Sequence, residues 1–427
     1  MSNNRIYQDK RLFVWLIMVC SYIHCAYSMH NNIIYNKATA STKQSISIAF
    51  HQLNIGNKRN IKLSRDIDLG GDTLVLPDSV VIKKGKGVFK NGTIIGKNTK
   101  IESNSQVFDH VSILGTWIVK NVSTELFVSL DYVNSLRDLF ALCNPNIQNI
   151  VTIEEGLYWV SMVAGHESIL DVASNTTIQL EGTINLVANA RPLYYIFNIK
   201  NSDNIVLSGN GKICGDKFEH KGTSGEWGMG LMISNSKNII ISGMTINNCW
   251  GDCIYVGSNS ENVKIKNCVL DNGRRQGISV TSGSNISIEQ CIISNVSGTA
   301  PEYAIDIEPN QNDTIDNIYI QGVVSENCIG GISLYGEAKN SKIGKVIIKD
   351  CKISGAKEKY PIRILTAHDV NIDRCDVNHK GQYGALLQNI ESLSMTGNIF
   401  TTNGKKPINI INCGKRSLKG NIEKNHE

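Results

Sequence analysis

The sequence has few aromatic and few charged residues for its length. Of its 427 residues, 7% are aromatic and 19% are charged, and the formal net charge is only +5. Nucleic-acid-binding and membrane-surface proteins depend on clustered Lys and Arg, and so small a net charge does not indicate either class. We therefore expect no nucleic-acid partner, and local basic residues would have to hold any acidic polymer.

Long apolar stretches are also missing. After the amino terminus, no run reaches the roughly 18 apolar residues that a membrane-spanning helix needs, so no membrane span is expected. Apolar residues recur at helical spacing in one segment, 129–143, and Asn144-Pro145 ends it. We predict a short helix there that caps or covers an open end of the fold.

The amino terminus resembles an export signal. Three cations precede the apolar run LFVWLIMVCSYI, and the small-residue region CAYS follows. This layout predicts a signal peptide, residues 1–28, that is cleaved after Ser28, and hence a secreted or periplasmic protein. The residues before Cys20 and Cys25 are bulky, which argues against lipid attachment at either cysteine without excluding it.

A repeat fills the remainder of the chain. Its markers are Met244, Cys268, Cys291, Val323, Cys351, Cys375 and Asn398, and they lie 23 or 24 residues apart where no loop is inserted. Val, Ile and Leu alternate with polar residues inside each repeat, which indicates strands, and Gly and Asn separate the runs as turns require. A repeat of strands this short cannot bury its own apolar face, whereas stacked coils ~4.8 Å apart can.

The repeat therefore predicts an all-β, right-handed parallel β-helix, whose hand follows from the rule for parallel crossovers. The pattern of leucine-rich repeats is absent. The marker cysteines Cys268, Cys291, Cys351 and Cys375 then form one inward ladder in which Cys acts as a small hydrophobe. Cys249 and Cys253 flank a turn, and the sequence leaves open whether they form a disulfide.

We divide the chain into the signal peptide 1–28, an N-terminal β segment 29–125 and a parallel β-helix domain 126–427. Two insertions, 214–230 and 295–303, lengthen individual coils. Insertions in a solenoid become loops on one face, so we expect these two to form the walls of a groove.

Polar residues of chemical interest gather between 227 and 310, next to both insertions. Asp252, Asp306 and Glu308 are predicted to point outward as a set of acids, with Asp252 and Asp306 two coils, ~10 Å, apart at the backbone. The predicted substrate-binding residues around them are Arg274, Arg275, Gln276, Trp227, Trp250, Tyr255 and Tyr303. Flat aromatic rings stack on sugars and paired acids cleave glycosidic bonds. The alternative is that these acids have no chemical role and only make an exposed sheet face hydrophilic.

The motifs WGDCIYVG, RQGIS and AIDIEPN resemble the pectin-lyase-like right-handed parallel β-helix superfamily, in its secreted bacterial form. This superfamily includes polygalacturonase-type glycoside hydrolases and polysaccharide lyases. The resemblance covers residues 150–413 as a coil pattern and residues 227–310 as motifs. Asp252 matches the second Asp of the polygalacturonase Gly-Asp-Asp-Cys motif, but Gln276 replaces an expected His, and Asp306 and Glu308 replace an expected Arg and Lys. The resemblance thus implies the scaffold but not the pectin-cleaving site.

The sequence leaves open three functions for this surface, each of which involves a polysaccharide. The first is a glycoside hydrolase that needs no cofactor and uses Asp252, Asp306 and Glu308. The second is a polysaccharide lyase, in which Arg274 or Arg275 would neutralise a uronate and the acids could bind Ca²⁺. The third is a non-catalytic binding or adhesion module.

Overall fold

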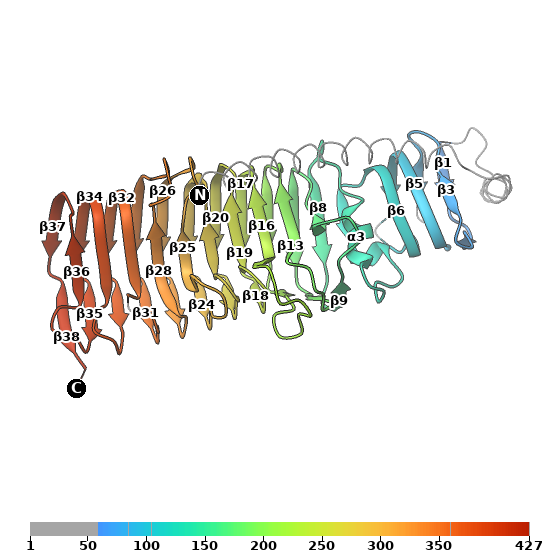
Figure 1. The fold of residues 1–427 in the computed structure, drawn as a ribbon. Helices are drawn as coiled ribbons and strands as arrows, with labels where there is room; N and C mark the ends of the chain where they lie inside the picture. The colour runs from blue at the N-terminus through green and yellow to red at the C-terminus, as the bar shows by residue number, and fades with distance from the viewer. Residues whose placement is uncertain (1–58, 84, 104, 359, 427) are drawn as a thin grey trace, which may run out of the picture.

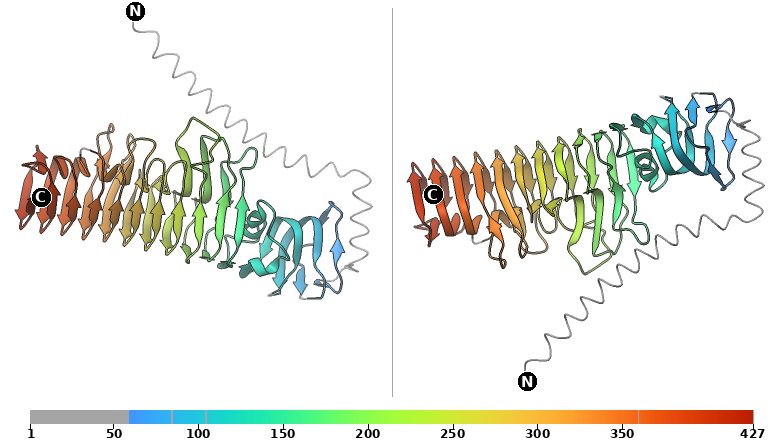
Figure 2. Two further views of the ribbon diagram at one scale, coloured as in Figure 1. Left: turned by 90° about the horizontal axis from the view of Figure 1, so that it is seen from below. Right: turned by 90° about the horizontal axis from the view of Figure 1, so that it is seen from above.

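The computed structural model describes residues 59–83, 85–103, 105–358 and 360–426. These residues form an elongated stack of strands that runs from β1 at one end to β38 at the other (Figures 1 and 2). The predicted signal peptide and the stretch 29–58 lie outside the described residues. In the described part, no helix has the length and apolar character needed to cross a membrane.

The strands belong to three sheets. The first sheet contains β1 (Asn60–Lys62), β2 (Ile67–Asp68), β3 (Thr73–Val75), β4 (Val81–Lys83), β5 (Phe89–Glu102) and β6 (Phe108–Ile118). The longest sheet contains β7 (Asn121–Ser123), β8 (Asn149–Ile153), β10 (Ser168–Asp171), β11 (Thr176–Leu180), β13 (Leu193–Lys200), β14 (Ile205–Ser208), β16 (Trp227–Ser234), β17 (Lys237–Ser242), β19 (Ile254–Gly257), β20 (Ser260–Lys266), β22 (Ile278–Val280), β23 (Gly283–Glu289), β25 (Tyr303–Ile307), β26 (Thr314–Gln321), β28 (Gly330–Tyr335), β29 (Lys342–Ile343), β30 (Lys345–Lys349), β32 (Ile362–Asp373), β34 (Ala385–Thr396), β36 (Ile408–Ile411) and β37 (Lys415–Lys419). The third sheet contains β9 (Leu157–Val160), β12 (Thr183–Leu186), β15 (Lys212–Cys214), β18 (Thr245–Asn247), β21 (Val269–Asp271), β24 (Ile292–Ser294), β27 (Val324–Glu326), β31 (Lys352–Ser354), β33 (Asp376–Asn378), β35 (Ile399–Thr402) and β38 (Ile422–Asn425).

Successive coils pair in parallel and in register, which confirms the predicted β-helix. For example, β19 pairs with β22, and β22 pairs with β25. A coil contains three strands, such as β19, β20 and β21, whereas the alternating pattern had indicated two. The third strand is only three residues long in most coils, and so short a run shows no clear alternation.

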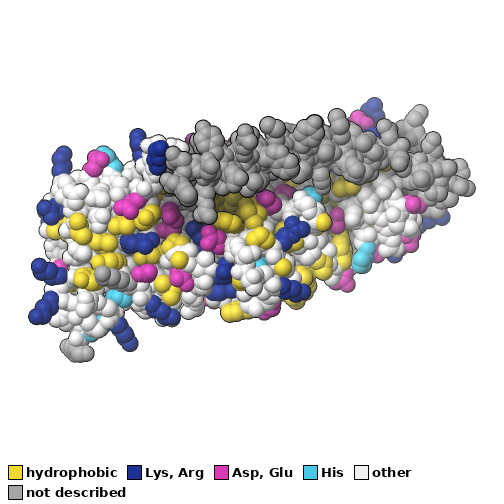
Figure 3. All heavy atoms as spheres, in the orientation of Figure 1, with side chains coloured by type: hydrophobic (Ala, Val, Ile, Leu, Met, Phe, Trp, Pro, Cys, Tyr) yellow, Lys and Arg dark blue, Asp and Glu magenta, His cyan; other side chains and the backbone are white. Residues whose placement is uncertain are grey.

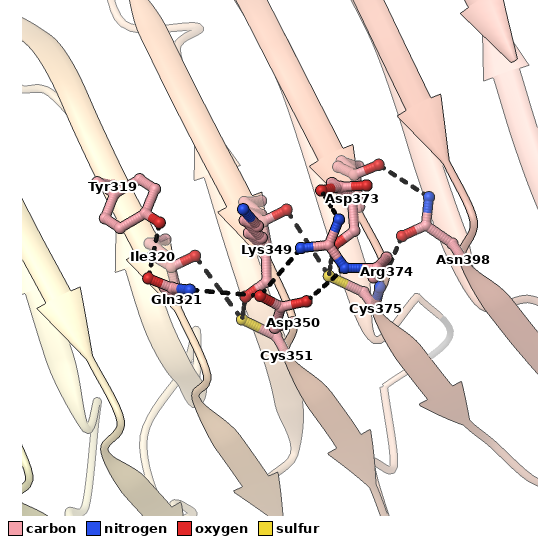
Figure 4. Close-up of polar contacts among 12 residues, drawn as sticks. Tyr319, Ile320, Gln321, Lys349, Asp350, Cys351, Asp373, Arg374, Cys375 and Asn398 are labelled. Carbon is pink, nitrogen blue, oxygen red and sulfur yellow. Dashed lines mark hydrogen bonds and ion pairs between the residues drawn. The ribbon is translucent and has the colours of Figure 1, made fainter. Parts of the chain in front are cut away.

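The cysteine ladder points inward as predicted. Cys268, Cys291, Cys351 and Cys375 are each at most 1% exposed. All ten cysteines of the described part are free thiols, including Cys249 and Cys253. In Figure 4, Cys351 and Cys375 lie on neighbouring coils, and the amide of Asn398 continues the ladder by accepting a hydrogen bond from the Cys375 N–H at 2.8 Å. The side chains therefore stack coil upon coil inside the solenoid.

A second ladder, of asparagines, stabilises the turns that the sequence had marked by Asn. Its members are Asn175, Asn204, Asn238, Asn262, Asn285 and Asn317, all with φ between 53° and 59°. Each side-chain amide after the first donates to the amide oxygen of the preceding member at 2.6–3.2 Å. Asn tolerates this left-handed conformation better than most residues, which explains its recurrence.

The predicted helix is shorter than the sequence pattern suggested. It consists of α3 (Ser135–Phe140), preceded by the 3₁₀ turn η1 (Thr124–Leu126). The helix packs against β6, β7, β9 and β10, so it covers the junction between the first sheet and the β-helix. Phe140 contacts Phe197 with ring centroids 5.8 Å apart. One continuous hydrophobic core runs through this junction, from Ile61 to Phe400.

We predict that brief alkylation of the native protein will leave the four ladder cysteines unmodified and will modify the half-buried Cys413 first. The reason is that the ladder thiols are enclosed between coils, where no reagent can approach. Peptide mapping after alkylation, before and after denaturation, measures this for each cysteine. Labelling of Cys268 or Cys351 at the rate of Cys413 would contradict the inward ladder.

Candidate active site

Outward side chains of five neighbouring coils form one column on the longest sheet. The column consists of Tyr255, Ser279, Asp306, Ser333 and Arg363, which are direct register partners on β19, β22, β25, β28 and β32. Their neighbours in each strand, such as Ile305 and Ile307, are fully buried in the core. Asp306 therefore lies in the middle of a column that continues for two coils on each side.

The two insertions lie together at the edge of the sheet where these strands begin, as expected for groove walls. Lys217 from the first insertion donates to the Asn272 side chain at 2.6 Å and to the Ser297 carbonyl, in the second insertion, at 2.9 Å. Arg274 lies between the insertions and donates to the Gly225 carbonyl at 2.9 Å. The loop between β15 and β16 stands out from the solenoid (Figure 2).

Arg275 is the centre of the acidic cluster. Its guanidinium lies 3.3 Å from an oxygen of Asp252 and 3.9 Å from oxygens of Glu226 and Glu308. Burial lowers the pKa of Arg275, but these carboxylates and Asp306 outweigh burial and hold it above the ordinary value. Arg275 is therefore a fixed positive charge that compensates several acids from different coils. On the face in Figure 3, acidic and basic side chains are interleaved in the same way over the middle of the molecule.

Asp252 is fully buried, whereas the sequence pattern had placed it on an exposed groove. Its carboxylate accepts hydrogen bonds from the Ser279 hydroxyl at 2.5 Å and from Arg275. Burial raises the pKa of Asp252, and the charge of Arg275 partly offsets the rise. Asp252 differs from the expectation because it precedes its strand, β19, and its carboxylate is enclosed by contacts with Ser279 and Arg275 of the next coil.

Asp306 is also buried, at 1% exposure. One carboxyl oxygen accepts a hydrogen bond from the Gln276 amide at 2.9 Å, and Gln276 accepts one from the Tyr303 N–H at 2.9 Å. The other oxygen, Oδ1, is enclosed and has no hydrogen-bond partner in the described part of the chain. Burial, followed by the charge of Glu308, raises the pKa of Asp306 to about 7. At neutral pH this carboxyl group thus holds a proton part of the time.

Glu308 is the accessible member of the set, with a side chain that is 39% exposed. It lies two residues beyond Asp306, on the same side of the chain. The structure therefore brings Asp252, Asp306 and Glu308 together around Arg275, but only Glu308 reaches solvent to this extent.

The predicted aromatic residues differ in how much ring surface they offer. Trp250 has His220 stacked on its ring at 3.9 Å and the Arg274 guanidinium at 3.8 Å from its ring centre, so both faces are covered. Tyr303 is fully buried. Tyr255 is half-buried, and its hydroxyl is 2.6 Å from that of Thr281. Trp227, at 45% exposure, is the aromatic residue of this set with the most ring surface available to a sugar.

Several residues that contact the cluster or share its column were not among the predicted site residues. Glu226 contributes to the cluster around Arg275, and its only signal was its position in the first insertion. Asp216 in the same insertion accepts hydrogen bonds from His220 at 2.9 Å and from Tyr194, and thereby holds the ring that covers Trp250. Ser279 and Arg363 could have been identified from the sequence, because they occupy the same outward position in their coils as Asp306 does. In the described residues, no group of three or more His, Cys, Asp or Glu side chains is arranged to hold a metal ion.

Comparisons with known proteins agree with this architecture. The sequence model of the right-handed β-helix region family matches residues 170–307. The uncharacterized protein YclG of Bacillus subtilis is 31% identical over 147 residues, which are 30% of this chain and 25% of that protein. The chain thus spans about a quarter of the length of this curated relative, and 28% of another, the prophage-derived protein YorA.

Two solved structures share the fold at low sequence identity. The endo-xylogalacturonan hydrolase from Aspergillus tubingensis is 15% identical, with a TM-score of 0.51 over 71% of this chain and 93% of its own. The polygalacturonase from Erwinia carotovora is 13% identical, with a TM-score of 0.51 over 72% and 94%. The chain has the right-handed parallel β-helix fold, as its repeat predicted.

We predict that Arg275→Met will destabilise the protein by about 3–5 kcal/mol, because it leaves the buried Asp252 carboxylate without its cation. Adding Asp252→Asn to this variant should restore most of the loss. Urea unfolding of the single and double variants measures the coupling. The neighbouring Arg274→Met is the control and should cost only about 1–2 kcal/mol, since Arg274 contacts a ring and a carbonyl. Equal losses from both substitutions, or no recovery in the double variant, would contradict the assigned role of Arg275.

Proposed function

We propose that this protein is an exported, carbohydrate-active enzyme, a glycoside hydrolase that cleaves a polysaccharide lying along the outward column of the longest sheet. The observation that carries the proposal is the state of Asp306. A general acid must hold its proton near neutral pH, and burial beside Glu308 provides that condition. Export rests on the amino-terminal sequence pattern alone.

Asp306 is assigned the general acid. Its Oδ1 lacks a hydrogen-bond partner in the described residues, so the protonated form has a donor without an acceptor. A glycosidic oxygen could supply that acceptor and receive the proton as the bond breaks. Gln276 would hold the other oxygen and keep the carboxyl group in one orientation.

Glu308 is assigned the general base, because its side chain is the most exposed of the three acids and can reach water. Residues two apart in a strand have Cα atoms roughly 6.6 Å apart. In inverting hydrolases the two carboxyl groups lie ~6.5–9.5 Å apart and leave room for a water molecule, and a backbone spacing of this size allows such a separation. Asp252, which reaches no solvent, would act through Arg275 as a positioning residue.

The lyase alternative has less support. A basic residue that removes a proton from a uronate needs a lowered pKa, whereas the surrounding acids hold the pKa of Arg275 above its ordinary value. The acids themselves are compensated by Arg275 and do not form an open oxygen cage for Ca²⁺. A non-catalytic binding module would not need a buried, protonated acid.

We predict that Asp306→Asn will lower activity by at least ~10²-fold, the scale expected for losing an acid–base group. The assay is release of new reducing ends from a polysaccharide panel, with Asp350→Asn, at a turn away from the column, as the control. Wild-type activity should decline as pH rises through about 7, because Asp306 loses its proton there. Full activity in Asp306→Asn would refute the assignment.

The same substitution should change the pH dependence of stability. The pKa of Asp306 is raised to about 7 in the folded state. The folded protein then binds more protons than the unfolded chain between about pH 4 and 7, so stability falls as pH rises through this window. The loss contributed by this one group is up to about 4 kcal/mol. Urea unfolding at pH 4.5 and pH 8 should therefore show a smaller decline for Asp306→Asn than for the wild type, and an identical decline would contradict the raised pKa.

A further inference from the structure

The third sheet ends at β9, and this end differs from the interior of the sheet. Strand β9 pairs with β12 on one side, and no strand of the described residues pairs with its other side, the free edge. The preceding coil contributes η1, α3 and the loop between them in place of a third strand. The period of the solenoid is thus interrupted beside β9, which contacts α3 at the junction (Figure 1).

The free edge presents unpaired backbone groups along its first half. Thr183 donates to the Gly156 carbonyl at 2.8 Å, which fixes the alternation of this parallel pair. Leu157 and Trp159 therefore direct their backbone groups away from β12. The Asn134 N–H covers the far half of the edge by donating to the Trp159 carbonyl at 2.9 Å. Within the described residues, neither the N–H nor the carbonyl of Leu157 has a hydrogen-bond partner.

A pocket of about 380 Å³ lies against this free edge. It is lined by residues 156–158 on one side and by residues between 124 and 131, from the preceding coil, on the other. Leu157 lines the pocket and is 56% exposed, and Trp159, two residues further along the strand, is 41% exposed. Neighbouring apolar side chains that are open to solvent are typical of an interaction site.

The rim of the pocket is negatively charged. Its lining includes three exposed acids, Glu125, Asp131 and Glu154, and no Lys or Arg. Among the ion pairs of the described residues, only that of Asp131 with His110, at 3.6 Å, involves one of the three. The charge of the rim therefore favours a basic partner.

The opposite end of the same sheet carries a protection that β9 lacks. There the edge strand is β38, which contains the exposed charged residues Glu423 and Lys424. Charged side chains and Pro are the usual means by which edge strands avoid pairing with other chains. Strand β9 has the sequence LYWV, with no charge and no Pro. It therefore retains the character of a template for a further strand.

We propose that the free edge of β9 is an interaction surface, which binds an extended basic segment of a partner protein as an additional strand of the third sheet. Backbone groups of Leu157 would pair with this segment. Its apolar side chains would contact Leu157, Trp159 and the pocket, and its Lys or Arg side chains would face the acidic rim. In this mode of recognition, main-chain hydrogen bonds supply affinity and alternate side chains supply specificity. The surface lies on a different sheet from the column of Asp306, so the inference is independent of the proposed hydrolase.

The probe is a fluorescein-labelled peptide of the sequence Lys-Val-Lys-Val-Lys-Val-Lys, and fluorescence anisotropy measures its binding to the full-length protein. A peptide with Glu in place of every Lys tests the charge and should bind at least about 10-fold more weakly. Two further peptides, with N-methyl groups on all Val or on all Lys residues, test the backbone pairing. At least one of them should lose binding, because alternate N–H groups of an added strand face β9.

Leu157→Lys places a positive charge on the edge and should weaken binding of the basic peptide at least about 10-fold. The matched control is Ile292→Lys. Ile292 has the same outward position in β24 and is 44% exposed, but β24 is paired on both sides, so this variant should bind like the wild type. The double variant Glu125→Gln/Glu154→Gln should weaken binding about 2–10-fold, the scale of two exposed ion pairs.

The inference is overturned if the wild type does not bind the basic peptide, or if the acidic peptide binds equally well. It is also overturned if both N-methylated peptides bind as tightly as the parent, or if Leu157→Lys and Ile292→Lys change binding alike.

Amide hydrogen exchange of the protein without peptide is the second measurement. The N–H groups of Leu157 and Trp159 should exchange rapidly and become protected when the basic peptide is added. Protection without peptide would assign the edge to another segment of this chain or, if it depends on protein concentration, to a second copy. Either result would overturn the proposal.

Discussion

In-register stacking of parallel strands is the constraint on which the rest of this structure depends. Every coil must place its inward, outward and turn positions above those of the previous coil, or the ladder of backbone hydrogen bonds is lost. This constraint produces the buried cysteine ladder and the chain of Asn amides. It also places Ser279, Asp306 and Ser333 in one column, although 27 residues separate each from the next. A site built on such a column is as rigid as the solenoid itself.

Burial of charge gives the column its chemistry. Asp252 and Asp306 are both enclosed, and burial raises the pKa of each. Arg275 lowers the free-energy cost of burying these carboxylates, since its positive charge compensates acids from three different coils. A protonated acid beside an ionised one is the arrangement that acid–base cleavage of a glycosidic bond requires. In the proposed hydrolase, the cluster would lose some stability at neutral pH and would hold a proton on Asp306 for the reaction.

Much of the fold, but less of the site, was accessible from the sequence. The repeat and its marker cysteines sufficed for the β-helix, because the period of a solenoid is imposed on every coil. The three-residue strands such as β21 were missed, since they are too short for alternation. The helix α3 is shorter than its apolar pattern because Asn134, with φ of 70°, is not helical, so that the helix begins only at Ser135. The acids and Arg275 were found as a group.

What the sequence could not show is how loops and neighbouring rings close over these residues. The burial of Asp252 and the covering of Trp250 by His220 and Arg274 depend on the path of the first insertion. The path of a loop follows no period, so the repeat of apolar residues that predicts the coils does not predict the loops. The two insertions were nevertheless recognised by their length, and the hydrogen bonds of Lys217 join the first to the second.

Hydrolysis of a polysaccharide with Asp306 as the general acid, as we propose, is tested most directly by mass spectrometry of the products. The wild-type protein is incubated with a polysaccharide panel in ¹⁸O-labelled water. Hydrolysis predicts that each newly formed reducing end carries one ¹⁸O atom and that no product contains an unsaturated sugar. Intact polysaccharide throughout the panel, or unsaturated fragments without the label, would contradict it.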